Sequence, residues 1–299
     1  MKKIIIGSRG SDLALWQAYF TKDNLERLGV DCEIKIIKTK GDKIQNLSFD
    51  KIEGKGFFTK EIETALLLGE IDLAVHSHKD LETDQPEGLV ISAVSYRENP
   101  TDLLLIRKES VDNTQKFNLK QDAIVGTSSA RRKNQVKFFR EDIELKDLRG
   151  NVPTRINKLR EGQYDAILLA TAGINRLKLD VSDLETVEMD PKEYIPAPAQ
   201  GVLAYQTRKN DAQTNEIVKQ LNNPEVADCI SVERTILNKL DGGCQLPLGA
   251  YCVKENDVFK LWASAADQWQ EAPVRIYREA SSTNELINEA IDSLKKKVS

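Results

Sequence analysis

Cysteine and histidine are both scarce in this chain of 299 residues, which has 4 cysteines and 2 histidines. The cysteines are neither spaced as C-x-x-C pairs nor dense enough for a secreted disulfide scaffold. They are Cys32, Cys229, Cys244 and Cys252. We therefore expect reduced thiols and no zinc or other metal.

Long apolar runs are also missing. The chain starts MKKIIIGSRGSD, where three isoleucines precede Gly7, far short of the apolar region of a signal peptide. No later run approaches the ~20 residues of a membrane helix. These absences predict a cytoplasmic protein that has no membrane partner.

An excess of positive charge is absent as well. The 43 Lys and Arg residues against 47 Asp and Glu residues give a net charge of −4, whereas nucleic-acid surfaces are normally basic, so we expect no nucleic-acid partner. Six arginines nevertheless lie beside glycines, small hydroxyl residues or turn signals: Arg9, Arg131, Arg132, Arg149, Arg155 and Arg176. A local anion site can exist inside an acidic protein.

Runs typical of strands alternate with runs at helical spacing, which predicts an α/β fold with a largely parallel sheet. The candidate strands are residues 3–6, 33–37, 72–76, 103–106, 123–125, 166–170 and 202–205. Helices are expected after Ser11 or Asp12, after Thr59 and from Pro153.

Two stiff, proline-bearing breaks divide the chain, around Asn99–Pro100 and over residues 194–201. If the strand at 202–205 returns to the first sheet, the chain crosses twice between two α/β domains, which predicts a hinged, two-lobed molecule with a cleft. After about Pro224 a helix, a hairpin, a strand and a helix predict a smaller α+β domain. The expected boundaries are 1–98 with 196–218, then 99–195, then 219–299.

The segments IIIGSRGSD and IVGTSSARRK share one pattern, in which a strand and a glycine lead to Ser and Arg at a helix start. Backbone N–H groups at such a terminus bind anions, and arginine adds a planar fork for carboxylate or phosphate. Simple N-capping by the hydroxyls is the alternative. Because LRGNVPTR and AGINRL add further arginines at loop–helix junctions, a polyanionic ligand is the better interpretation.

The segment DLAVHSHKD places polar side chains beyond the end of a strand, where ligands sit in open α/β sheets. Structural roles for His76 and His78 are favoured over metal ligation, since no third partner is near in sequence. Asp80 is open to several interpretations, including a helix cap or an ion pair with Lys79.

Cys244 stands in LDGGCQLPLGAY, directly after two glycines. Flanking glycines let a bulky group approach the backbone, and a thiolate is a soft nucleophile for an electrophilic methylene. A small buried hydrophobe in a tight turn is the alternative interpretation, and it is the one we keep for the other three cysteines.

Taken together and in order, eight segments closely resemble the porphobilinogen deaminase (hydroxymethylbilane synthase) family. They are GSRGSDLALWQA, GKGFFTKEIETALL, DLAVHSHKDL, VGTSSARRKNQ, LRGNVPTRINKL, YDAILLATAGINRL, PAPAQG and DGGCQLPLGAY. The resemblance implies two domains similar to type II periplasmic binding proteins, plus a third domain whose cysteine arm projects into the cleft. That cysteine, here Cys244, would carry a dipyrromethane through a thioether.

The reaction implied by the resemblance joins four porphobilinogens head to tail and releases hydroxymethylbilane. Asp80 would be the catalytic carboxylate, and a monomer is expected. Cofactor contacts are implied for Ser11, Lys79, Asp80, Thr127, Ser128, Ser129, Arg131, Arg132 and Arg155. Substrate contacts are implied for Arg9, Ser11, Lys55, Arg149, Arg155 and Arg176.

Two other classes remain open. A solute-binding module would share the lobes and the anion site, but it would have no need of a cysteine arm. A thiol hydrolase would pair Cys244 with His76 or His78.

Overall fold

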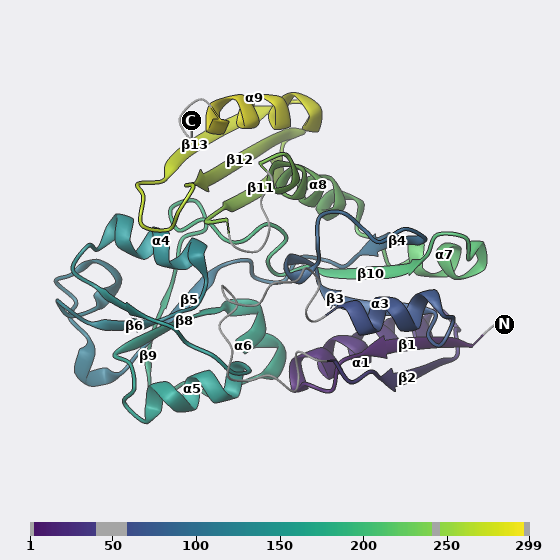
Figure 1. The fold of residues 1–299 in the computed structure, drawn as a ribbon, viewed down its shortest axis with the longest axis horizontal. Helices are drawn as coiled ribbons and strands as arrows, with labels where there is room; N and C mark the ends of the chain where they lie inside the picture. The colour runs from purple at the N-terminus through teal and green to yellow at the C-terminus, as the bar shows by residue number, and fades with distance from the viewer. Residues whose placement is uncertain (1–2, 40–58, 241–245, 296–299) are drawn as a thin grey trace. The chain divides into compact units, whose positions relative to one another are not determined.

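The computed structural model describes residues 3–39, 59–240 and 246–295 (Figure 1). The chain forms two compact units. The first comprises Met1–Glu98 and Gly201–Asp228, and the second comprises Asn99–Gln200 and Cys229–Ser299.

The first unit contains a five-stranded sheet in the order β2-β1-β3-β10-β4. Its strands are β1 (Ile4–Ser8), β2 (Cys32–Ile36), β3 (Leu73–Ser77), β4 (Leu89–Val94) and β10 (Leu203–Arg208). Its helices are α1 (Asp12–Arg27), α3 (Lys60–Leu67), α7 (Ala212–Lys219) and the 3-10 turn η2 (His78–Asp80). Ile4 and Ile6 of β1 join the core cluster of α1, whereas Ile5 packs in the cluster of α3, so helices cover both faces of the sheet.

The second unit contains a five-stranded sheet in the order β7-β6-β8-β5-β9. Its strands are β5 (Asp102–Ile106), β6 (Ile124–Gly126), β7 (Glu144–Lys146), β8 (Ala166–Ala170) and β9 (Glu185–Glu188). Its helices are α4 (Ala130–Phe139), α5 (Val152–Arg160), α6 (Thr171–Leu177) and the short turns η3 (Lys108–Ser110) and η4 (Lys116–Asn118). Alternate residues of β5 and β8 pack in opposite core clusters, one with α4 and one with α5 and α6.

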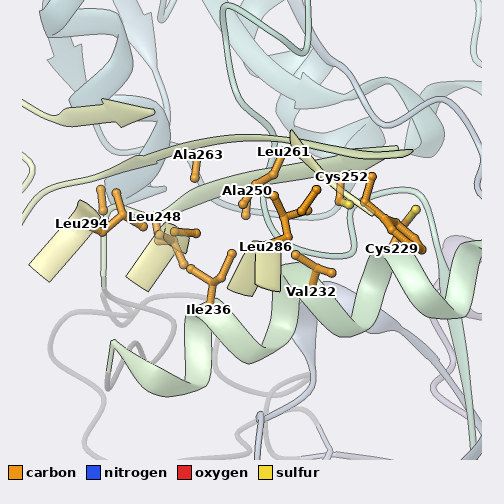
Figure 2. Packing of buried hydrophobic residues seen from close by; sticks show 14 residues of the cluster. Cys229, Val232, Ile236, Leu248, Ala250, Cys252, Leu261, Ala263, Leu286 and Leu294 are labelled. Carbon is orange, nitrogen blue, oxygen red and sulfur yellow. The ribbon is translucent and has the colours of Figure 1, made fainter. Parts of the chain in front are cut away.

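The C-terminal part of the second unit is a small antiparallel sheet, β11-β12-β13, with two helices. The elements are α8 (Pro224–Lys239, which starts in the first unit), β11 (Gly249–Glu255), β12 (Val258–Ala265), β13 (Val274–Ala280) and α9 (Thr283–Lys295). Figure 2 shows Val232 and Ile236 of α8 packed with Leu261 of β12 and Leu286 of α9. This buried cluster fixes the ends of the two elements, α8 and β11, that flank residues 241–245.

The α/β class and the return of the chain to the first sheet are confirmed, because β10 lies between β3 and β4. The expectation of a largely parallel sheet is confirmed for strand direction, because four of the five strands in each sheet point the same way, but not for the pairing of neighbours. In each five-stranded sheet two pairs of neighbours are parallel and two are antiparallel. The antiparallel pairs involve β5, which follows the entry of the chain into the second unit, and β10, which follows its return. Both strands start at the sheet edge where the parallel strands end.

The finer division into three domains, its boundaries and the hinged cleft stay predictions. Among the described helices, none combines the length and apolarity needed to cross a bilayer. The three cysteines in the described residues, Cys32, Cys229 and Cys252, are buried and form no disulfide.

Candidate active site

The predicted cationic and hydroxyl residues of the second unit all follow the carboxyl ends of three of its strands. Strands β6, β7 and β8 run parallel, so their carboxyl ends meet at one edge of the sheet. The residues that follow these strands are Thr127, Ser128, Ser129, Arg131 and Arg132 after β6, Arg149 and Arg155 after β7, and Arg176 after β8. We call this the cationic edge.

Hydroxyl side chains join the loops of the cationic edge. Ser128 Oγ donates to the carbonyl of Leu148 at 3.0 Å and accepts from its N–H at 3.1 Å, which ties the loop after β6 to the loop after β7. Ser129 caps α4 by accepting from the N–H of Arg132 at 3.4 Å, and Thr127 Oγ1 accepts from the N–H of Ser129 at 3.3 Å. Capping, the alternative considered from the sequence, is therefore one role of these residues.

Arg131 and Arg132 lie at the start of α4 and share one buried carboxylate. Arg131 Nη1 and Arg132 Nη2 each lie 2.7 Å from an oxygen of Asp102, whose side chain is fully buried. Burial acts to raise the pKa of Asp102, but the positive charges and hydrogen bonds of both arginines outweigh it and hold that pKa well below its usual range. Two guanidinium groups against one carboxylate leave a net positive charge in the interior.

Local contacts hold the side chain of Arg155 and the backbone of Arg149. Arg155 on α5 donates from Nε to the carbonyl of Gly150 at 2.7 Å, and Lys158 donates to the carbonyl of Arg149 at 3.1 Å. Pro153 lies in the first turn of α5, although the helix starts one residue earlier at Val152, capped by Asn151. Arg176 on α6 is buried, with 6% of its surface exposed.

The first unit places Arg9, Ser11, Lys79 and Asp80 at the carboxyl-end edge of its own sheet, after the parallel strands β1 and β3. Ser11 is the N-cap of α1 and accepts from the N–H of Ala14 at 3.4 Å. Asp80 ends the turn η2 and is exposed, with no hydrogen bond or ion pair to any other described residue. The cap and ion-pair alternatives for Asp80 therefore find no contact in the described part of the chain.

His76 on β3 has a structural position. It is buried and lies 3.1 Å from Oε1 of Gln206 through Nε2. Burial lowers the pKa of His76 to about 4, against the smaller raising effect of the Gln206 hydrogen bond. The ring is thus neutral near pH 7. No group of three or more His, Cys, Asp or Glu side chains that could hold a metal ion occurs in the described ranges.

Cys244 and Lys55 lie outside the described residues. The two elements that flank Cys244, α8 and β11, are joined by Glu233, whose Oε1 accepts from the N–H of Cys252 at 2.7 Å. Glu233 is fully buried, and its Oε2 accepts from the N–H of Ala199 at 2.7 Å. The chain around the cysteine segment is therefore anchored to residues 195–200.

Two residues near these edges were not predicted from the sequence. Asp102 stands directly before the apolar run Leu103–Ile106, and a charged residue that starts a buried strand is a signal for a buried ion pair. Gln17 on α1 is 3% exposed and donates to Ser77 Oγ at 2.8 Å. A buried amide in an amphipathic helix gives a weaker signal.

Two mixed α/β sheets, each with basic side chains beyond its strand ends, define the class as an α/β protein with cationic strand ends. Two family models match the chain. "Porphobilinogen deaminase, dipyromethane cofactor binding domain" covers residues 4–216, and "Porphobilinogen deaminase, C-terminal domain" covers residues 227–292. The chain belongs to the porphobilinogen deaminase family.

Curated relatives agree with the family models. A porphobilinogen deaminase of Maridesulfovibrio salexigens is 45% identical over 278 residues, covering 92% of this chain and 88% of the relative. One of Nitratiruptor is 42% identical over 295 residues, covering 98% and 93%. Among solved structures, a probable amino-acid ABC transporter extracellular-binding protein of Bacillus subtilis is 12% identical with a TM-score of 0.46, covering 79% of this chain and 97% of that one. A likeness this distant does not bear on function.

Proposed function

We propose that this protein is a hydroxymethylbilane synthase: it deaminates four porphobilinogen molecules, joins them head to tail and releases the linear tetrapyrrole. Its family and the motifs shared with that family support the assignment. We extend the proposal to a monomer in the cytoplasm, with three domains.

The observation that carries the proposal is the uncompensated positive charge at the cationic edge. Among the described residues, Asp102 is the one carboxylate that pairs with Arg131 and Arg132, and the buried Nε of Arg131 has no hydrogen-bond acceptor there. Porphobilinogen carries an acetate and a propionate on each pyrrole, so its oligomers are polyanions. Charge-assisted hydrogen bonds of this kind are worth about 1.5–3 kcal/mol each, enough to retain a growing chain.

The dipyrromethane fits the same residues, because its carboxylates can accept a hydrogen bond from Arg131 Nε and can balance the positive charge left by Arg131 and Arg132. When bound, it supplies the primer to which pyrrole units are added. Ser11, Lys79, Thr127, Ser128, Ser129, Arg131, Arg132 and Arg155 would contact its carboxylates, and Cys244 would hold it covalently. Arg9, Ser11, Lys55, Arg149, Arg155 and Arg176 would contact the substrate.

Asp80 would act on the reacting pyrrole. Loss of ammonia from porphobilinogen leaves positive charge centred on the pyrrole nitrogen, and a fixed carboxylate beside that nitrogen stabilises the charge as it develops. The same carboxyl group would move protons to the leaving amine and from the new carbon–carbon bond. The exposed position of Asp80 after β3 supports access to substrate.

The thiol-hydrolase alternative is weakened by His76, which is buried against Gln206 with a pKa of about 4, well below that of a useful general base. The solute-binding alternative predicts an unmodified Cys244. A measurement of the intact mass of the protein therefore distinguishes the proposed function from both alternatives.

Intact mass tests the proposal. We expect the purified protein to be heavier than its sequence by one dipyrromethane, and Cys244→Ser to have the bare sequence mass and no synthase activity. Cys32→Ala is the matched control, because the thiol of Cys32 is buried and its pKa is raised to about 11, mainly by burial. This control should keep the added mass. An active wild-type protein of bare sequence mass would overturn the proposal.

A further inference from the structure

Asp102 is held in one orientation at the start of β5. Its Oδ2 accepts from Arg131 Nη1 at 2.7 Å. Its Oδ1 accepts from Arg132 Nη2 at 2.7 Å, from Arg132 Nε at 3.1 Å and from Gln200 Nε2 at 3.0 Å. The backbone of Asp102 pairs with Ala170 in the sheet, so neither the main chain nor the carboxylate is free to turn.

The charge of this group differs from that of an ordinary ion pair. In the same unit Arg140 and Asp142 pair one to one, with Nε–Oδ1 at 2.8 Å and Nη2–Oδ2 at 2.6 Å. Asp102 instead faces both Arg131 and Arg132, all nearly buried, so one positive charge is left over within the described part of the chain. A buried charge without a counter-ion is strongly unfavourable, which indicates that an anion completes the group.

The donors that remain show where that anion would bind. Three of the five N–H groups of the Arg132 guanidinium have acceptors, two at Asp102 and one at the carbonyl of Leu168, 2.8 Å away. Arg131 Nη1 also has acceptors, Asp102 and the carbonyl of Ile195 at 2.9 Å. Arg131 Nε is buried with no acceptor in the part of the chain that the structure describes. Nε and Nη2 form one edge of the guanidinium plane, the fork that binds a carboxylate through two parallel hydrogen bonds.

We propose that Asp102 is a positioning residue: by holding Nη1 of Arg131, it presents the Nε–Nη2 edge of that arginine to one carboxylate of the pyrrole ligand. The leftover positive charge of the group then matches the single negative charge of that carboxylate. Asp102 acts through Arg131 and does not itself touch the ligand. This inference rests on the proposed function, which supplies the carboxylate.

The test compares Asp102→Asn, Asp102→Glu and the matched control Asp142→Asn, which breaks an Arg–Asp pair away from the cationic edge. Apo-protein of each is given porphobilinogen, and the rate at which it gains the cofactor mass is followed, with circular dichroism as the measure of folding. We expect Asp102→Asn to gain the mass at least about tenfold more slowly. This factor corresponds to the loss of one charge-assisted hydrogen bond between Arg131 and the ligand carboxylate. Asp102→Glu should recover part of the rate, and Asp142→Asn should stay within about twofold of wild type.

A folded Asp102→Asn that gains the mass at the wild-type rate would overturn the positioning role. If Asp102→Asn does not fold, Asp102→Glu takes its place, and a folded Asp102→Glu that gains the mass at the wild-type rate would overturn the positioning role. If neither variant folds, the side-chain N–H signals of arginine in the nitrogen-15-labelled wild type decide. The Arg131 Nε–H signal, assigned with Arg131→Lys, should shift downfield and exchange more slowly in the cofactor-carrying protein than in the apo-protein. An unchanged signal would overturn the proposal.

The proposed function and the positioning role of Asp102 predict different results if they are wrong. If the wild-type protein never gains mass, the proposed function is wrong, and no carboxylate remains for Asp102 to position. If the wild type gains mass and the Asp102 variants gain it equally fast, only the positioning role is wrong.

Discussion

His76 makes the stability of the first unit depend on pH. Its pKa is about 4 in the folded protein, chiefly because burial disfavours the charged ring, and about 6.5 in an unfolded chain. Between these values the unfolded chain binds more protons than the folded one, so stability falls as the pH falls through this window. At pH 5 the loss relative to neutral pH is about 2 kcal/mol from this residue.

We therefore predict that His76→Gln flattens the pH dependence of unfolding. Urea unfolding at about pH 7.5 and pH 5 should show that the wild type loses about 2 kcal/mol more than His76→Gln between the two conditions. The comparison uses the difference between pH values, so a general destabilisation by the substitution cancels. Equal losses in both proteins would show that His76 does not set this dependence.

Asp80 is the residue for which charge and shape can be separated most cleanly. Asparagine keeps the size of the side chain and removes its charge, so Asp80→Asn should fold normally and turn over at least ~10²–10³-fold more slowly. Asp80→Glu restores the charge slightly displaced, and it should retain more activity than Asp80→Asn. Because Asp80 is exposed and bonds to no other described residue, neither change should alter thermal stability much.

The measurement is steady-state turnover of cofactor-loaded protein, with loading verified by mass. Turnover of Asp80→Asn within a few-fold of wild type would show that Asp80 is not the catalytic carboxylate.

At the scale of elements, the sequence predicts those whose apolar residues are buried. Strand β8 (Ala166–Ala170) has the predicted bounds, and helix α1 starts after its predicted cap, Ser11. Strands β7 and β9 were missed, since ELK and ETVE lie at sheet edges, where one side of the strand is unpaired and few side chains are buried. Strand β4, LVISAV, carries an apolar signal and could have been predicted.

Strand direction and ion pairing depend on tertiary structure, and so they escaped prediction. Nothing local in the segment of β10 shows that it runs antiparallel to β3, because direction depends on where the chain re-enters the unit. The arginines of the cationic edge were predicted from their loop–helix junctions. Their partner Asp102 was not, because it lies 29 residues from Arg131 in sequence and is brought there by β5 and α4.

For the whole molecule, the ligand and the protein have the same sign of charge. The chain has a net charge of −4, and each pyrrole added to the product adds two carboxylates. Long-range attraction therefore cannot retain the intermediates, and retention depends on arginines at short range. Loss of one such arginine should accordingly affect late intermediates, which carry the most charge, more than folding or the first addition.

Helix α5 offers a matched pair of arginines for this prediction. Arg155 lies at the cationic edge beside Gly150, whereas Arg160 at the end of the same helix pairs with Asp183, with Nη2–Oδ1 at 2.6 Å. We expect Arg155→Leu to reduce turnover roughly 10- to 150-fold, the equivalent of one charge-assisted hydrogen bond. Arg160→Leu, which removes an exposed ion pair and an exposed hydrogen bond to the carbonyl of Asp180, should stay within about twofold.

Native mass spectrometry of protein mixed with porphobilinogen would resolve the complexes that carry one to four added units. Arg155→Leu should shift this distribution toward the early complexes while its far-ultraviolet dichroism matches that of wild type. Because the contact of Arg155 is partly solvated, added salt should move the wild-type distribution in the same direction. Identical distributions for Arg155→Leu and Arg160→Leu would mean that the cationic edge does not retain the growing chain, and binding would then have to depend on other residues.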